Sequence, residues 1–252
     1  MRLTRVYVDA PLTPGEKVAI EGGAANHIMR VLRLRVADTV TLFNGTNQEY
    51  DASIEAFHKN AVVVSIRDER SRDRESPLQL TLAQGISRGE RMDWILQKAT
   101  ELGASRIVPL FTERSVVRLD AKQAEKKSQH WRGITVSACE QCGRNRLPEL
   151  DSPLELHEFL AANVAGETRL LLSPTAELTV DDLAATGAAP TAAPALGAIV
   201  VLIGPEGGLT DLEVDHALRA GFRSIRIGPR VLRTETAAIA ALTIMQERFG
   251  DL

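Results

Sequence analysis

The chain has 252 residues, enough for one large domain or two of ordinary size. An apolar fraction of 44% suits a packed core, and no apolar stretch approaches the ~18 residues that a membrane-spanning helix needs. Two cysteines are too few for a disulfide framework, and the N-terminus shows no signal-peptide core. We therefore expect a cytoplasmic protein that is not bound to a membrane.

The net charge of −3 conceals a gradient along the chain. Residues 1–77 carry 11 Lys and Arg against 11 Asp and Glu, residues 78–146 carry 12 against 7, and residues 147–252 carry 7 against 15. Affinity for a phosphate backbone depends on local basic clusters rather than on the sum. The excess of basic residues in the middle segment is therefore compatible with a nucleic-acid partner. A basic run that is simply exposed to solvent is an equally good interpretation.

The first part of the chain has the pattern of a small β-barrel. Turn signals such as Asn44-Gly45 and Lys59-Asn60 separate short alternating or apolar runs. One helical segment, residues 24–34, interrupts them, with His27 on its apolar stripe and Arg30 and Arg33 on other faces. We expect strands over residues 3–8, 39–43, 49–56 and 61–66.

A charged segment follows the barrel pattern. Residues 67–77 contain eight charges in eleven positions and almost nothing apolar, so they cannot enter a core. We place the domain boundary here and predict a domain over 1–72 and another over 73–252.

After the boundary, strand and helix patterns alternate, which predicts a parallel α/β domain. Ser87 and Glu90 have capping-box spacing before a helix to Leu102, and Thr210 and Glu213 have it before a helix that ends near Gly221. An Ala/Pro-rich run over 184–197 reads as a loose loop. We expect further helices over 121–142 and 235–249, and strands over 78–83, 105–110, 168–172, 198–203 and 222–227.

Two glycine-bearing segments near the C-terminus are the most informative part of the chain. Each is an apolar run that stops at Gly-Pro, at Gly204-Pro205 and again at Gly228-Pro229, and precedes a helix pattern. Ligands of parallel sheets bind outside the carboxyl ends of the strands. The two turns therefore predict a pocket walled by main chain, or else two tight turns that bind nothing.

These segments carry a resemblance to a known family. Ile203-Gly-Pro-Glu-Gly-Gly-Leu-Thr210 and Gly228-Pro-Arg-Val-Leu-Arg-Thr-Glu-Thr-Ala237 resemble the last two motifs of the trefoil-knotted (SPOUT) RNA methyltransferases. Together with Lys98–Gly103, Glu140–Arg144 and His27–Arg33 they resemble the bacterial small-subunit (16S) ribosomal RNA uridine-N3 methyltransferases. The likeness spans nearly the whole chain.

The resemblance implies a PUA-like β-barrel that docks RNA, followed by a SPOUT α/β domain whose knot lies in the Gly-Pro loops. It implies S-adenosylmethionine as cofactor, 16S ribosomal RNA or the small ribosomal subunit as partner, and a homodimer. The expected RNA-binding residues are His27, Arg30, Arg33, Arg88 and Arg144. The expected cofactor-binding residues are Leu172, Ser173, Ile203, Gly204, Pro205, Glu206, Gly207, Gly208, Ile227, Gly228, Leu232, Thr234, Thr236 and Ala237.

Methylation at uridine N3 needs removal of a proton and stabilisation of charge on the uracil oxygens. The carboxylates Glu206 and Glu235 and the cations Arg233 and Arg144 are the catalytic candidates. For Glu235, an acidic residue suited to the first turn of a helix is an equally good interpretation.

Several alternatives stay open. Cys139 and Cys142 have the spacing of half a zinc site, but there is no second pair, so they read as packing residues and we expect no metal. A SPOUT enzyme that methylates a ribose 2′-hydroxyl or another base is one rival function. A non-catalytic RNA-binding assembly factor is another. For the apolar stripe Ile239, Leu242, Met245 and Phe249 of the last helix, the dimer interface competes with burial against its own sheet.

Overall fold

The structure is a computed structural model that describes residues 4–115, 120–162, 166–185 and 197–252. It divides into two compact units. The first comprises residues 1–75 and 136–147, and the second comprises residues 76–135 and 148–252. The first unit therefore takes in a segment that lies far beyond residue 72.

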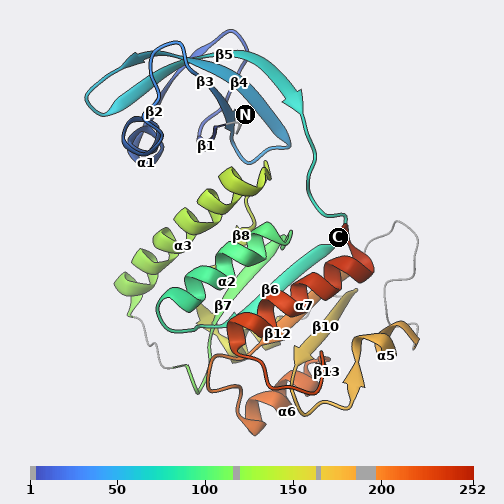
Figure 1. Ribbon diagram of the computed structural model, residues 1–252. Helices are drawn as coiled ribbons and strands as arrows, with labels where there is room; N and C mark the ends of the chain where they lie inside the picture. Colours follow the sequence, from blue (N-terminus) through green and yellow to red (C-terminus); the bar gives the residue numbers. More distant parts are fainter. Residues whose placement is uncertain (1–3, 116–119, 163–165, 186–196) are drawn as a thin grey trace. The chain divides into compact units, whose positions relative to one another are not determined.

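The first unit is built on a curled five-stranded sheet in the order β1-β3-β4-β5-β2 (Figure 1). Its apolar residues, such as Val40, Leu42, Ile54 and Val64, alternate along the strands and form one core. β1 runs parallel to β3, and the other pairs are antiparallel. The strands are β1 (Arg5–Tyr7), β2 (Lys17–Glu21), β3 (Thr39–Phe43), β4 (Gln48–Phe57) and β5 (Ala61–Ser71).

The helical segment of this unit begins and ends two residues earlier than the sequence predicted and is less regular. α1 (Gly22–Asn26) passes into a π-helical turn, His27–Leu32, that ends where Arg33 adopts a left-handed conformation with φ of 52°. The charged segment lies at the surface as expected, since β5 is exposed from Arg67 to Ser71.

The second unit contains an eight-stranded sheet in the order β11-β13-β10-β12-β6-β7-β8, with β9 beside β7. All of its strand pairs are parallel, as expected for this part of the chain. The strands are β6 (Gln79–Gly85), β7 (Arg106–Phe111), β8 (Glu149–Leu150), β9 (Leu154–Glu155), β10 (Glu167–Leu172), β11 (Leu178–Thr179), β12 (Ala198–Ile203) and β13 (Arg223–Arg226).

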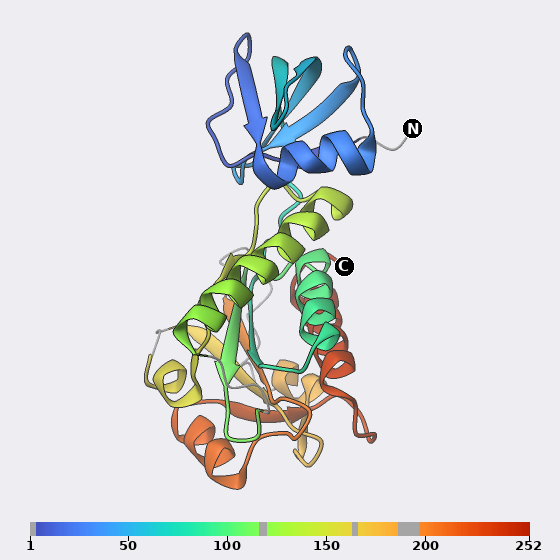
Figure 2. The same cartoon turned by 90° about the vertical axis from the view of Figure 1, so that its left-hand side faces the viewer.

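Helices cover both faces of this sheet because successive strand residues point to opposite sides. Val201 packs with α2 and α7, which lie side by side in Figures 1 and 2. Val200 packs on the other face with α4 and α6. The helices are α2 (Glu90–Glu101), α3 (Ala121–Cys142), α4 (Leu156–Ala161), α5 (Val180–Ala185), α6 (Asp211–Arg219) and α7 (Thr234–Phe249).

Two local expectations had different outcomes. The capping box at Thr210 and Glu213 is confirmed, because each residue's backbone N–H bonds to the other's side chain. The capping box at Ser87 is wrong: α2 begins after Gly89 with no side-chain cap, and the buried Ser87 hydroxyl bonds to Gly85 O instead.

The apolar stripe of α7 is only partly buried, because Ile239 and Phe249 keep some exposed surface. Leu242 and Met245 have no exposed surface and belong to the core of their own domain, so the interpretation as an interface is wrong for these two residues. The face of α7 that remains exposed carries Thr236, Thr243 and Glu247 instead. The expected loop over 184–197 lies almost wholly outside the described residues. None of the helices in the described ranges is long and apolar enough to cross a membrane.

Candidate functional site

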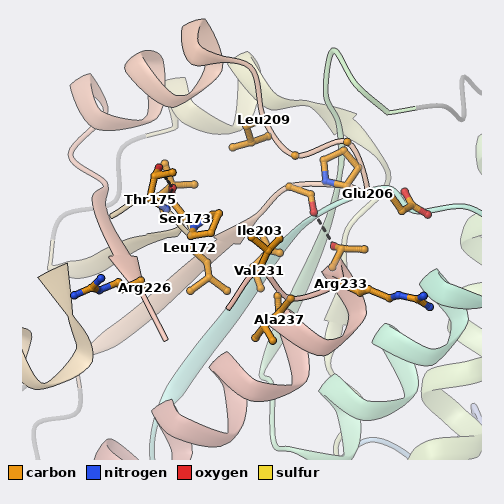
Figure 3. A pocket seen from close by; sticks show the side chains of 18 of the residues that line it. Leu172, Ser173, Thr175, Ile203, Glu206, Leu209, Arg226, Val231, Arg233 and Ala237 are labelled. Carbon is orange, nitrogen blue, oxygen red and sulfur yellow. Dashed lines mark hydrogen bonds between the residues drawn. The ribbon is translucent and has the colours of Figure 1, made fainter. Parts of the chain in front are cut away.

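The two Gly-Pro turns lie side by side at the carboxyl ends of β12 and β13. β10 separates these strands in the sheet, so the ends of three parallel strands meet at one place. Between them is a cavity of about 660 Å³ (Figure 3). It falls at the edge of the sheet where parallel α/β domains bind ligands.

Nearly all the expected cofactor residues line this cavity. The structure brings together Leu172, Ser173, Ile203, Gly204, Pro205, Glu206, Gly207, Gly208, Ile227, Gly228, Leu232, Thr234 and Ala237. Thr236 is the exception, because it points away on the exposed face of α7 and is not part of the lining.

The glycines of these turns are required by close contacts and by backbone conformation. A Cβ atom on Gly85, at the end of β6, would lie 2.5 Å from Pro205 N, and one on Gly204 would lie 3.0 Å from the carbonyl carbon of Gly208. Gly208 and Gly228 have φ angles of 68° and 136°, which side chains rarely permit. At these glycines the wall of the cavity is main chain.

A buried amide links the two turns and was missed by the sequence analysis. The Gln84 side chain, at the end of β6, has no exposed surface, and its Nε2 lies 3.0 Å from Thr234 Oγ1 and 3.3 Å from Gly204 O. The Thr234 hydroxyl also donates to Gly204 O at 2.7 Å (Figure 3). The sequence signal that could have identified Gln84 is a polar residue at the carboxyl end of an apolar strand, directly before a glycine.

Charged side chains from α2 and from the two turns gather at the rim. Glu206 accepts hydrogen bonds from the backbone N–H of Arg88 at 2.9 Å and from the Arg91 guanidinium at 2.8 Å. Burial raises the pKa of the Glu206 carboxyl, but these hydrogen bonds outweigh it and hold the pKa below its usual value. Arg91, which was not among the expected site residues, lies 4.0 Å from Glu235 as well.

Arg114 and Arg233 add positive charge to this lining. The Arg114 guanidinium donates to the carbonyls of Gly207 and Leu209. Arg233 caps no backbone group at the start of α7 and is exposed. In Figure 3 its side chain extends on the same side of the pocket as that of Glu206.

Arg144 is not among the residues that line this cavity. It belongs to the first compact unit, is 5% exposed, and pairs with Glu75 at 2.5 Å. A role for Arg144 in contacting RNA would require that ion pair to open. Near it in sequence, Glu140 accepts a hydrogen bond from Tyr7 N–H, so the segment 136–147 is tied to β1.

The other expected RNA contacts are placed as follows. Arg30 and Arg33 are exposed on the π-helical turn and its end, and His27 is half-buried beside them. Arg88 is exposed before α2, with its backbone bonded to Glu206.

The arrangement fits a small ligand that has both apolar and polar or charged parts, because the lining combines apolar side chains with main-chain groups and charged side chains. Cavities of this size hold drug-sized ligands, and peptide N–H and C=O groups match the donors and acceptors of an adenine edge. Among the residues that the structure describes, no cluster of three or more His, Cys, Asp or Glu could hold a metal ion.

Comparison with known proteins gives the same picture over the whole chain. Residues 74–246 match the family described as RNA methyltransferase domain, and residues 20–67 match the RNA methyltransferase PUA domain. The ribosomal RNA small subunit methyltransferase E of Buchnera aphidicola from Schizaphis graminum is 34% identical over 100% of this chain and 98% of its own. The Bacillus subtilis protein of that name is 31% identical over 89% and 88%.

The chain is also similar to solved structures of methyltransferases. A methyltransferase from Legionella pneumophila, in complex with S-adenosylmethionine, is 42% identical with a TM-score of 0.93 over 100% of both chains. The ribosomal RNA small subunit methyltransferase E of Neisseria gonorrhoeae, also bound to S-adenosyl methionine, is 37% identical with a TM-score of 0.87 over 99% of both chains.

Proposed function

The chain belongs to the family of the ribosomal RNA small subunit methyltransferases E, and we propose that it methylates the N3 position of a uridine in 16S ribosomal RNA, in the decoding region of the small subunit. The methyl donor is S-adenosylmethionine. One observation carries the proposal: two Gly-Pro turns enclose a single cavity whose rim holds Arg233, Glu206 and Glu235.

The residues present fit this donor. Main-chain groups of the two turns would hold its adenosine part, with Leu172, Ile227 and Leu232 as apolar walls. Bound there, the donor supplies a methyl group activated by a sulfonium. The protein's contribution is to hold the uracil in line with that methyl group, and such positioning contributes about 7–11 kcal/mol to lowering a barrier.

The side chains at the rim supply the remaining chemistry. Charge develops on the uracil oxygens as N3 loses its proton, and the exposed Arg233 guanidinium is suited to bind those oxygens or a neighbouring phosphate. Either carboxylate at the rim is a candidate acceptor for the proton.

RNA docking is assigned to Arg30 and Arg33 of the first unit, helped by His27, and to Arg88 beside the pocket. A homodimer remains part of the proposal. With Leu242 and Met245 buried, the pairing surface would be the exposed side of α7 around Thr243 and the adjacent Trp94 of α2, which is 54% exposed. Sedimentation of Thr243→Arg against the wild type tests it, and a monomeric wild type with full activity would refute it.

The function is tested by mass spectrometry of nucleosides. Small ribosomal subunits that lack the modification are incubated with the protein and S-adenosylmethionine, and their RNA is digested. N3-methyluridine is the expected product. If 2′-O-methyl nucleosides or another methylated base appear instead, the enzyme has a different target. If nothing is methylated and no cofactor binds, the chain is an assembly factor.

A further inference from the structure

The two carboxylates at the rim of the pocket differ in how their oxygens are used. Glu206 is engaged through one oxygen, Oε1, which accepts hydrogen bonds from both the Arg88 backbone N–H and the Arg91 guanidinium. These bonds lower the pKa of its carboxyl despite partial burial. A carboxylate stabilised in this way in its ionised form is a poor proton acceptor.

Glu235 is not engaged in this way. Its Oε2 is shielded from solvent and has no hydrogen-bond partner among the described residues. Its Oε1 lies 4.0 Å from Arg91 Nε, beyond hydrogen-bond distance, and the side chain is 16% exposed. A position in the first turn of α7 accounts for an acidic residue here. It does not account for a buried oxygen that lacks a partner.

A buried carboxylate oxygen without a partner is costly, so such groups usually meet a partner supplied from outside the chain. An ionised carboxylate only accepts hydrogen bonds, and the missing partner must therefore be a donor. Because Glu235 lines the pocket, that donor belongs to a ligand. The N3–H of uracil is a donor of this kind, and it carries the proton that must leave.

We propose that Glu235 is the proton acceptor of the reaction and that Glu206 is a positioning residue which anchors α2 to the first Gly-Pro turn. The inference rests on the proposed uridine-N3 function. As N3 forms its bond to the methyl carbon, its proton passes to Oε2 of Glu235. The carbon–sulfur bond breaks with its electron pair left on sulfur, so the carboxylate and sulfonium charges are both neutralised.

The main competitor for Glu235 is a donor on the cofactor itself, such as an amino group or a ribose hydroxyl. The two partners predict different effects on binding. If Glu235 meets the cofactor, removal of its charge weakens cofactor binding. If Glu235 meets uracil, the cofactor binds equally well without it.

The experiment compares Glu235→Gln and Glu206→Gln with the wild type. Glu125→Gln is the matched control, since it makes the same change at an exposed position of α3 that does not line the pocket. Cofactor affinity is measured by calorimetry on the protein alone. Single-turnover methylation of unmodified small subunits is measured as a function of pH, and the product is identified as above.

Glu235→Gln should slow methylation by about 10²–10⁴-fold, the usual contribution of a general base, with cofactor affinity unchanged. Its rate should rise by about tenfold per pH unit, because only uracil that has already ionised reacts, while the wild-type profile is flatter. Glu206→Gln should weaken cofactor binding and raise KM for the cofactor while leaving the shape of the pH profile intact. Glu125→Gln should match the wild type.

Two outcomes would overturn the assignment. A loss of cofactor affinity in Glu235→Gln would place its donor on the cofactor, and a wild-type rate and pH profile in that variant would exclude it as the base. Failure of the function itself has another signature, since the wild type would then yield a product other than N3-methyluridine.

Discussion

The hydroxyl of Thr234 ties the two Gly-Pro turns together, and its removal is a sharp test of the pocket. Thr234→Val keeps the shape of the side chain but deletes the donor to Gly204 O and the acceptor for Gln84 Nε2. Each buried hydrogen bond contributes about 1 kcal/mol, so the variant should lose about 2 kcal/mol of unfolding free energy. For a domain of this size the melting midpoint should fall by about 4–8 °C.

The same substitution should weaken the pocket, because Gly204 and Thr234 both line it. We expect cofactor affinity to fall by up to about tenfold, corresponding to about 1.4 kcal/mol. Unfolding is followed by tryptophan fluorescence, since both tryptophans, Trp94 and Trp131, lie in the second unit. Calorimetry gives the affinity.

Thr234→Ser is the control, because it keeps the hydroxyl and loses one methyl group, worth about 0.8 kcal/mol when buried. The reasoning is refuted if the valine variant is as stable and binds as tightly as the wild type. It is equally refuted if the serine variant is as damaged as the valine variant.

The remaining predictions concern the core, the RNA surface, the rim and the thiols. Leu242→Glu places a charge in a fully buried position and should unfold the second unit, as seen by circular dichroism, rather than release folded monomers in sedimentation. Arg30→Ala with Arg33→Ala should weaken RNA binding and reduce the log–log salt slope by about 0.7–0.9 per lost phosphate contact, with cofactor affinity constant; an unchanged slope would contradict this. Arg233→Ala should lower turnover far more than cofactor affinity, and a loss confined to affinity would make it a wall of the pocket. Burial raises the pKa of Cys139 to about 12, so its thiol stays protonated below that pH and should resist alkylation of the native protein at pH 8 in peptide mapping.

The segments that the sequence predicted best are those with one dominant signal. The strand over 198–203 and the helix over 121–142 have the expected bounds, because a continuous β-branched run before Gly-Pro and a long run of helix formers have few competing interpretations. β2, Lys17–Glu21, was missed although Pro14-Gly15 and Gly22-Gly23 flank it, because it has only three apolar residues, with a charge at each end.

The parts of the site that could not be predicted depend on partners far away in the sequence. Gln84 matters because it meets Thr234, 150 residues later, and Arg91 matters because it meets Glu206 and Glu235. Periodicity likewise shows that one side of α7 must be buried, but it carries no information on which surface buries it. Only the contacts of Leu242 with its own core decide that question.

The first unit is formed by two segments that are far apart in the sequence, residues 1–75 and 136–147, and they are synthesised at different times. Arg5 bonds to Asn145 at 2.6 Å, and Arg144 pairs with Glu75, so the first unit includes contacts with residues that follow α2 and β7. Synthesis proceeds from the N-terminus at about 5–20 residues per second. For several seconds after residue 75 has left the ribosome, Arg144 and Asn145 have not yet been synthesised. During that time Glu75 and Arg5 therefore lack these two partners. The folding of the N-terminal unit is thus coupled in time to the synthesis of residues 76–135 of the second unit.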